Sequence, residues 1–211
     1  GEMSLRGLEG RLRALFYTSP VFITRYGETY QGEPIKLIDP EMYLTTPSIH
    51  IFDISGLDIL DQQLFLAVLL DQLYRVSTLR KNLTTLLIIE EAHNYAPAAG
   101  TSVAKSYIAK IAREGRKFGL GLCLITQRPT KLDPDVVSQA MTQIFKRMIN
   151  PHDLRYVATV AEHLDDPRPL RTLDEAEAVV TGISVPVPLM IVVDQRWTQH
   201  GGVTPSIRRQ V

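Results

Sequence analysis

The chain has 211 residues, of which 45% are hydrophobic and 22% charged; this is the composition of an ordinary globular domain with a substantial core. Lysine and arginine together number 23, as do aspartate and glutamate, so the net charge gives no support to broad electrostatic binding of nucleic acid, although a local basic patch is not excluded. The longest apolar run near the middle, residues 64–70, is too short to cross a bilayer, and no signal peptide is visible. We therefore expect a cytoplasmic protein that does not enter a membrane.

Residues 1–48 carry little readable pattern. Four leucines between residues 5 and 15 have helical spacing, and the prolines and the glycine between residues 31 and 47 indicate extended or turning chain. We expect an N-terminal segment of helical and irregular structure that precedes the folded core.

The middle of the chain alternates between predicted strands and predicted helices. Apolar runs predict strands at residues 86–91 and 121–126, and residues 49–54 are a further strand candidate,. Between them, residues 57–76 predict a long and largely buried helix, and residues 101–118 predict an amphipathic helix that ends at Gly119. Cys123 has no cysteine partner within the chain, and we expect it to be a small buried hydrophobic side chain.

The last third begins with two helix-start signals. Asp133-Pro134 and Asn150-Pro151 each join an N-cap residue to a proline at the first helical position,, and they predict helices from residue 134 to about 140 and over residues 151–163. Residues 143–149 are a strand candidate, and two edge strands of a hairpin are predicted at residues 178–182 and 189–193. Residues 196–211 read as a polar tail.

Strands that alternate with helices predict an α/β fold with a mostly parallel sheet, helices on both faces, and a C-terminal edge hairpin. We expect this core to extend from residue 49 to residue 195.

Glu90 and Glu91 directly follow the apolar run of residues 86–89. This run predicts a strand buried on both faces, and a buried parallel strand ends at the edge of the sheet where α/β proteins bind ligands. Two acids there are costly to desolvate unless they face water, a metal or a partner. One interpretation is the acid pair of a nucleotide hydrolase, in which Glu90 holds Mg²⁺ through water and Glu91 polarises the attacking water. The other is that both glutamates begin a solvated loop, and this stretch alone leaves the two interpretations open.

Five short motifs follow one another between residues 52 and 135: FDISGL (52–57), IEEAHN (89–94), IAREGRKFG (111–119), TQRP (126–129) and KLDPD (131–135). Their order and spacing continue through Asn150-Pro151, the strand at residues 178–182 and HGG at residues 200–202. The whole series resembles the C-terminal part of the ATPase domain of HerA-type DNA translocases, in the FtsK–HerA branch of the RecA-like P-loop ATPases. Five motifs in register are far more specific than any one of them.

The resemblance implies a RecA-like fold and roles for three residues at strand ends. Glu90 and Glu91 resemble the Walker B pair, with Glu90 as the Mg²⁺ ligand and Glu91 as the catalytic carboxylate. Gln127 resembles the polar sensor that reads the γ-phosphate of ATP. From the residues alone, Gln127 could equally be a strand-end side chain bonded to the backbone.

The resemblance also implies an arginine finger, a cation that neutralises charge in the nucleotide site of a neighbouring subunit. Arg116 is the candidate, and Arg113 and Arg147 are the alternatives; each could instead be a solvated cation. We expect His93 to be a structural hydrogen-bonding residue, because the five histidines show no zinc-site spacing,.

One departure from the family is large. The sequence contains no G-x-x-x-x-G-K-[ST] motif, and no glycine is followed by lysine, so the Walker A loop that cradles the phosphates is missing. We expect an incomplete domain that carries the hydrolytic acids without the nucleotide cradle.

The resemblance implies that the chain is part of a homo-hexameric motor that uses ATP and Mg²⁺ to move along double-stranded DNA, beside a NurA-type nuclease in DNA-end processing. The isolated chain is expected to be inactive. Two alternatives stay open: a conjugation or antiviral-defence motor of the same superfamily, and a non-catalytic binding module that keeps the fold but lacks the phosphate loop.

Overall fold

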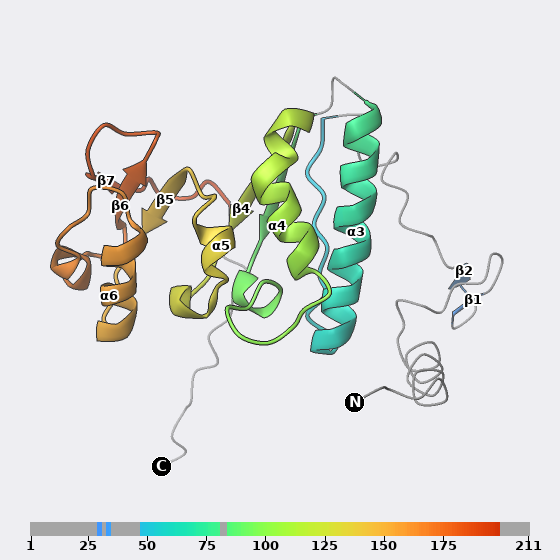
Figure 1. The fold of residues 1–211 in the computed structure, drawn as a ribbon, viewed down its shortest axis with the longest axis horizontal. Helices are drawn as coiled ribbons and strands as arrows, with labels where there is room; N and C mark the ends of the chain where they lie inside the picture. Colours follow the sequence, from blue (N-terminus) through green and yellow to red (C-terminus); the bar gives the residue numbers. More distant parts are fainter. Residues whose placement is uncertain (1–28, 31–32, 35–46, 81–83, 199–211) are drawn as a thin grey trace, which may run out of the picture. The chain divides into compact units, whose positions relative to one another are not determined.

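The computed structural model describes residues 29–30, 33–34, 47–80 and 84–198 (Figure 1). The helix predicted from the leucines at residues 5–15, most of the N-terminal segment and nearly all of the polar tail lie outside these residues. The chain forms two compact units, one ending at Ala140 and one beginning at Met141, and each is described by itself. In the described part of the chain, no helix combines the length and the apolar character needed to cross a membrane.

The long helix of the first unit is α3, Ile59–Leu79. Its N-cap is Asp58, whose carboxylate accepts a hydrogen bond of 2.9 Å from the Asp61 amide, which satisfies one of the free amides of the first turn. Apolar residues are buried along most of its middle, including Leu66 and Leu70. The predicted helix at residues 57–76 is thus confirmed, shifted by two or three residues at each end.

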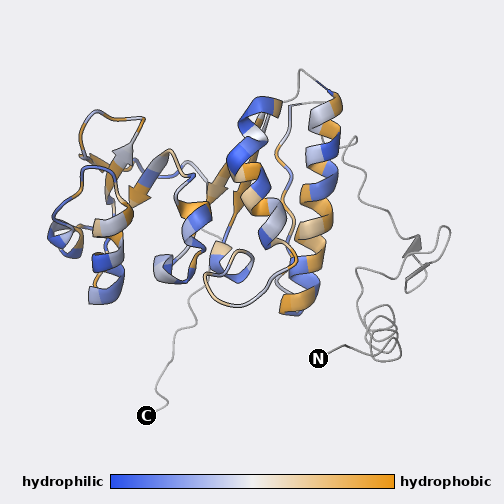
Figure 2. Cartoon of the chain, in the orientation of Figure 1, coloured by the Kyte–Doolittle hydropathy of each residue, from blue (hydrophilic) through white to orange (hydrophobic). Residues whose placement is uncertain are grey.

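Strands β3, Thr85–Ile89, and β4, Leu120–Leu124, form a parallel pair in which Thr85 lies opposite Leu120 and Ile89 opposite Leu124. The chain crosses between them through α4, Lys105–Glu114, which lies beside α3 (Figure 1). Figure 2 shows hydrophobic and hydrophilic residues alternating along α4, as expected for an amphipathic helix.

The helix predicted at residues 101–118 is shorter than expected, because α4 ends at Glu114 and the chain continues as the 3-10 helix η2, Gly115–Phe118. Gly115 is buried, and a Cβ there would lie 2.9 Å from both the Leu120 carbonyl oxygen and the Ile111 side chain. The chain therefore passes β4 at a distance that only glycine allows. Gly119 has φ of 75° and ends the segment as predicted,.

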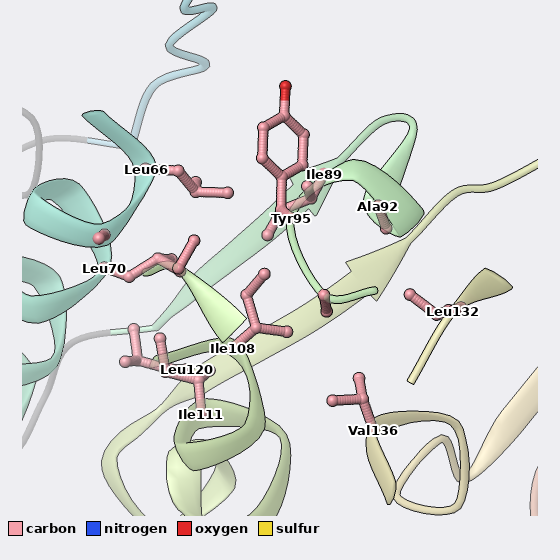
Figure 3. Close-up of a cluster of buried hydrophobic side chains, with 13 residues drawn as sticks. Leu66, Leu70, Ile89, Ala92, Tyr95, Ile108, Ile111, Leu120, Leu132 and Val136 are labelled. Carbon is pink, nitrogen blue, oxygen red and sulfur yellow. The ribbon is translucent and has the colours of Figure 1, made fainter. Parts of the chain in front are cut away.

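The core of the first unit lies between the helices and one face of the β3–β4 pair. Figure 3 shows Leu66 and Leu70 of α3 meeting Ile108 and Ile111 of α4, while Tyr95 points its hydroxyl out of the cluster. A parallel pair of strands buried by helices on this face is what the alternating pattern predicts.

The other face of the β3–β4 pair is open in the described residues. Leu86 and Ile88 are 63% and 61% exposed, and Cys123 is also exposed. The predictions of burial on both faces and of a buried Cys123 are therefore wrong here, because α3 and α4 pack against the same face.

Residues 49–54 do not form the predicted strand. Ile49 and Ile51 are exposed, Phe52 packs its ring 5.7 Å from that of Phe65, and the Asp53 carboxylate accepts hydrogen bonds from the amide and the hydroxyl of Ser55. An apolar alternating run becomes a strand only where a neighbour supplies the ladder hydrogen bonds, which a local pattern does not reveal.

The remaining elements of the first unit are short. They are the antiparallel strands β1, Thr29–Tyr30, and β2, Glu33–Pro34; the 3-10 helices η1, Ala92–Asn94, and η3, Pro129–Lys131; and α5, Pro134–Val137. Helix α5 starts at the predicted Asp133 cap but ends three residues earlier than predicted.

The second unit has an antiparallel sheet of β5, Thr142–Phe145, β6, Glu177–Gly182, and β7, Leu189–Val192, in the order β5-β6-β7. Helix α6, Pro151–Val160, starts at the predicted Asn150 cap and, with the 3-10 helix η4, Arg168–Arg171, encloses a small apolar core. The predicted hairpin is β6–β7, but the prediction that both are edge strands is wrong for β6, because β6 pairs with β5 as well as with β7. Parallel pairing in the described residues is confined to β3 and β4.

Candidate functional site

The carboxyl ends of β3 and β4 stay joined beyond the last paired residues. The Ile125 amide donates to the Ile89 carbonyl oxygen at 2.9 Å, and the Ala92 amide donates to the Ile125 carbonyl oxygen at 2.9 Å. Because the strands are parallel, the residues that follow them gather at one edge of the sheet. Glu90 and Glu91 are thus brought to the same edge as Thr126 and Gln127.

Glu91 has a left-handed backbone, with φ of 47° and ψ of 42°. For a residue with a Cβ this conformation costs about 1–3 kcal/mol and persists only where its surroundings impose it. The Asn94 amide donates to the Glu91 carbonyl oxygen at 2.9 Å, and η1 begins immediately afterwards. The turn therefore presents the Glu91 carboxylate, which is 45% exposed, in a fixed direction beside the exposed Glu90.

His93 links the two strand ends. Its Nδ1 atom lies 2.9 Å from the Thr126 hydroxyl oxygen and 3.4 Å from Oε2 of Glu91, and its side chain is only 12% exposed. The same Thr126 oxygen accepts a hydrogen bond of 3.0 Å from the Arg128 amide. One imidazole thus contacts both the acid after β3 and the loop after β4.

Helix α3 forms hydrogen bonds with the segment that follows the acid pair in sequence. The Tyr95 hydroxyl donates to Oε1 of Gln62 at 3.0 Å, and Nε2 of Gln63 donates to the Asn94 carbonyl oxygen at 2.8 Å. Burial raises the pKa of Tyr95, and the negative charge of Glu91 raises it further. Tyr95 therefore stays protonated at neutral pH and can act as the donor.

Lys105 and Asp133 fasten the other side of the site. The Lys105 ammonium lies 2.5 Å from Oδ2 of Asp133 and donates to the Pro97 carbonyl oxygen at 2.9 Å, while the Asp133 amide donates to the Ala96 carbonyl oxygen at 2.9 Å. Burial alone would raise the pKa of Asp133, but the Lys105 ammonium and the amides that Asp133 caps together lower it,. The loops after β3 and β4 are thereby held together by an ion pair as well as by a backbone hydrogen bond.

No protein-family model matches the sequence. A probable DNA double-strand break repair helicase HerA from Methanocaldococcus jannaschii is 40% identical over 119 residues, which are 56% of this chain and 24% of that protein. The DNA double-strand break repair helicase HerA of Sulfurisphaera tokodaii is 28% identical over 198 residues, or 88% of this chain and 39% of that protein. The chain is a relative of the HerA-type ATPases.

A solved structure supports the same fold. The genome packaging NTPase B204 of Sulfolobus turreted icosahedral virus 2, in complex with ATP-gammaS, superposes with a TM-score of 0.58 at 20% identity and covers 76% of this chain and 74% of that chain. The predicted RecA-like α/β fold is confirmed. The chain spans a quarter to two fifths of the length of the HerA relatives compared above.

The HerA resemblance assigns roles to three strand-end residues, and the structure brings all three to one edge. Glu90 and Glu91 follow β3, and Gln127, which is exposed, follows β4. No hydrogen bond of the Gln127 side chain is seen among the described residues. This edge therefore presents two carboxylates and an amide to whatever binds there.

The arginine-finger candidates of the HerA resemblance lie elsewhere. Arg113 is in the last turn of α4 and Arg116 in η2, at the edge where β3 and β4 begin, because the Thr85 amide donates to the Gly119 carbonyl oxygen at 2.9 Å. Both therefore lie at the edge of the sheet opposite to the one that carries Glu90 and Glu91. Arg147 belongs to the second unit.

The acid pair fits a hard cation only in part. Carboxylate oxygens are suitable Mg²⁺ ligands, and both glutamates reach solvent. In the parts of the chain that the structure describes, however, no three His, Cys, Asp or Glu side chains come together to hold a metal ion. Since Mg²⁺ keeps several waters and shares phosphate oxygens, Glu90 fits a role as a ligand through water.

Several residues at the site were not anticipated from the sequence. The prediction of a hydrogen-bonding role for His93 agrees with its contacts, but its partner Thr126 was not identified. Lys105 was not singled out in the sequence, yet its side chain is half-buried against Asp133. For its partner Asp133, the sequence offered one signal, the helix-start pattern Asp133-Pro134.

Proposed function

We propose that the chain carries the hydrolytic acids of an ATP-driven motor that moves along double-stranded DNA. The observation that supports the proposal is the edge where Glu90, Glu91 and Gln127 meet, in a chain related to helicases named for DNA double-strand break repair. A structural relative bound to an ATP analogue has the same fold. DNA-end processing with a NurA-type nuclease is the cellular setting that we propose.

In this motor, Glu91 accepts the proton of an attacking water and aligns it with the γ-phosphate, as its fixed turn and exposed carboxylate permit. Glu90 would hold Mg²⁺ through a water molecule, and the ion would neutralise phosphate charge. Gln127 donates to the γ-phosphate and distinguishes ATP from ADP. Each role uses a side chain that reaches solvent at this edge.

Arg116 fits a role in trans. It lies at the opposite edge of its own sheet, so it would reach the nucleotide of a neighbouring copy in a ring. A homo-hexamer satisfies this requirement, since every subunit then presents its acids to one neighbour and its arginine to the other.

The test is turnover of ATP by the full-length protein and by its Glu91→Gln variant. The charge of the general base is lost while its shape is kept, and we expect a drop in kcat of at least about 100-fold with nucleotide binding retained. Glu162→Gln, the same change at an exposed glutamate of the second unit, is the matched control. Full turnover by Glu91→Gln would refute the role of Glu91.

The binding-module alternative rests on the absence of a phosphate-loop motif from the sequence. It predicts that the full-length protein neither binds nor hydrolyses MgATP. We expect the isolated chain to hydrolyse ATP poorly or not at all, and robust turnover by the purified chain, abolished by Glu91→Gln, would contradict this expectation.

A further inference from the structure

The imidazole of His93 lies between the residues that follow β3 and β4. Its Nδ1 atom lies within 3.4 Å of two oxygens, one on Glu91 and one on Thr126. This one nitrogen lies close to a carboxylate and a hydroxyl that belong to different strand ends.

The two contacts fix the tautomer. A bare Nδ1 lone pair would be repelled by the Glu91 carboxylate, whereas an Nδ1–H is attracted to both oxygens. The Thr126 oxygen already accepts from the Arg128 amide at 3.0 Å, and its second lone pair remains for His93. The arrangement is therefore satisfied when His93 carries its proton on Nδ1 and donates it.

We propose that His93 is a positioning residue that shares one Nδ1–H between Glu91 and Thr126. This inference rests on the proposed function, since it concerns how the hydrolytic carboxylate is oriented. The shorter contact goes to Thr126 and the longer to Glu91, so the carboxylate is steered while its remaining lone pairs stay available to accept from water.

The same bond couples the acid to the sensor. Thr126 directly precedes Gln127, and its hydroxyl also holds the Arg128 amide, so a shift of the loop after β4 changes the distance from Thr126 to His93. When Thr126 moves away, the Nδ1–H turns to Glu91 alone, and the orientation of the carboxylate changes. His93 would thus report the state of the γ-phosphate sensor to the general base within one subunit.

A purely structural role makes a different prediction. If His93 only fills space, any substitution of similar volume should lower stability and leave the catalytic parameters of the folded protein unchanged. Two variants separate these roles. The amide nitrogen of asparagine takes the place of Nδ1, whereas that of glutamine takes the place of Nε2.

The experiment compares His93→Asn and His93→Gln in the full-length protein, with ATP turnover and thermal unfolding measured on the same samples. We expect His93→Gln to lower kcat by about 10- to 100-fold, the usual loss when a residue that orients a functional side chain is replaced. The KM for ATP should be nearly unchanged. His93→Asn should recover most of kcat. His152→Gln, in the second unit, removes an Nδ1 that is also hydrogen-bonded, to Arg155, and should keep the parental rate.

Thr126→Val and Thr126→Ser supply an independent arm. Valine removes the acceptor and should reproduce the loss seen in His93→Gln, serine should keep the rate, and the double variant His93→Gln/Thr126→Val should be no worse than either single variant. Equal kcat in His93→Asn and His93→Gln, or additive effects in the double variant, would overturn the proposal.

A failure of the proposed function can be told apart from a failure of this inference. If Glu91→Gln keeps full turnover, the proposed function fails, and the coupling to catalysis fails with it. If Glu91→Gln is inactive but both His93 variants turn over normally, only the inference fails. The ¹⁵N resonances of the imidazole provide a readout without turnover: we expect the Nδ1–H form in the parent, and an Nε2–H form would overturn the proposed geometry.

Discussion

The two units differ in the direction of strand pairing, and the candidate functional residues lie together only in the first unit. In the first unit β3 and β4 run parallel, so the residues that follow both strands meet at one edge. In the second unit β5, β6 and β7 are antiparallel, so consecutive strands end at opposite edges and their following residues are kept apart. The direction of pairing, more than the composition of the strands, decides where a site can form.

Burial differs in the same way. The central strand β6 buries both Ala178 and Thr181 completely and is paired on both sides, whereas β3 keeps Leu86 and Ile88 exposed on one face. In the second unit β6 and β7 form a local hairpin, while β5 and β6 are joined through α6 and η4. The first unit depends on α3, α4 and side-chain contacts between distant loops, so its integrity should be more sensitive to single polar contacts.

The largest effect is expected where the second unit depends on one glycine. Gly182 has φ of 95°, and a Cβ there would collide with the Met141 carbonyl oxygen and lie 3.2 Å from Cα of Thr142. Strain and overlap together should lower the stability of this unit by roughly 3 kcal/mol in Gly182→Ala. Hydrogen exchange should show faster exchange in β5–β7 and unchanged protection in β3–β4.

Gly100→Ala is the control for that experiment. Gly100 has a similar φ of 89°, but a Cβ there meets nothing within 4 Å, so only the backbone strain of about 1–2 kcal/mol applies. Equal losses in the two variants would show that the close approach to Met141 is unimportant. Loss of protection in β3–β4 by Gly182→Ala would break the comparison, because the units would then unfold together.

A smaller effect is expected from the ion pair that closes the site of the first unit. Lys105→Met removes the ammonium and leaves the buried Asp133 carboxylate with its two amide donors, which should cost about 2 kcal/mol. Chemical denaturation followed at the first unit measures this change. Asp71→Asn, which breaks the exposed pair with Arg75, should change stability by less than about 0.5 kcal/mol, and a similar loss in both variants would contradict the importance of burial.

Much of the fold could be predicted from local pattern. Helix α3 and strands β3 and β4 follow from apolar runs, and the starts of α5 and α6 follow from the caps at Asp133 and Asn150, which are visible in the sequence. The strand expected at residues 49–54 and the burial of Cys123 could not be predicted, because both depend on which neighbour covers a face or completes a ladder. The end of α4 at Gly115 depends on a close contact with Leu120 that no local pattern contains.

The site was predictable in its parts but not in its connections. Glu90, Glu91 and Gln127 were placed at strand ends, and parallel pairing brings them together as expected. The bond between His93 and Thr126 joins residues 33 positions apart, so it exists only through the register of β3 against β4. The position of Arg116 at the starting edge of the sheet follows from the direction of α4, which returns the chain to that edge.

The smallest effect concerns an exposed carboxylate of the second unit. Hydrogen bonds from the side chain and the backbone of Arg168 lower the pKa of Asp166 from 3.8 to about 2. A carboxylate whose pKa is lower in the folded than in the unfolded protein stabilises the fold above the unfolded pKa, and this contribution is lost as the pH falls through the folded pKa. The contribution of Asp166 should therefore disappear between about pH 4 and pH 2.

Asp166→Asn tests this sign. The variant keeps an acceptor for the Arg168 amide but has no charge, so it should be slightly less stable than the parent at neutral pH and equal to it near pH 2. Because the pair is exposed, with 84% and 49% of the two side chains accessible, salt should reduce the difference. Asp165→Asn is the neighbouring control. A large stability difference that does not change with salt would contradict this prediction. The exposed Asp166 would then contribute as much to stability as the buried Asp133 of the first unit.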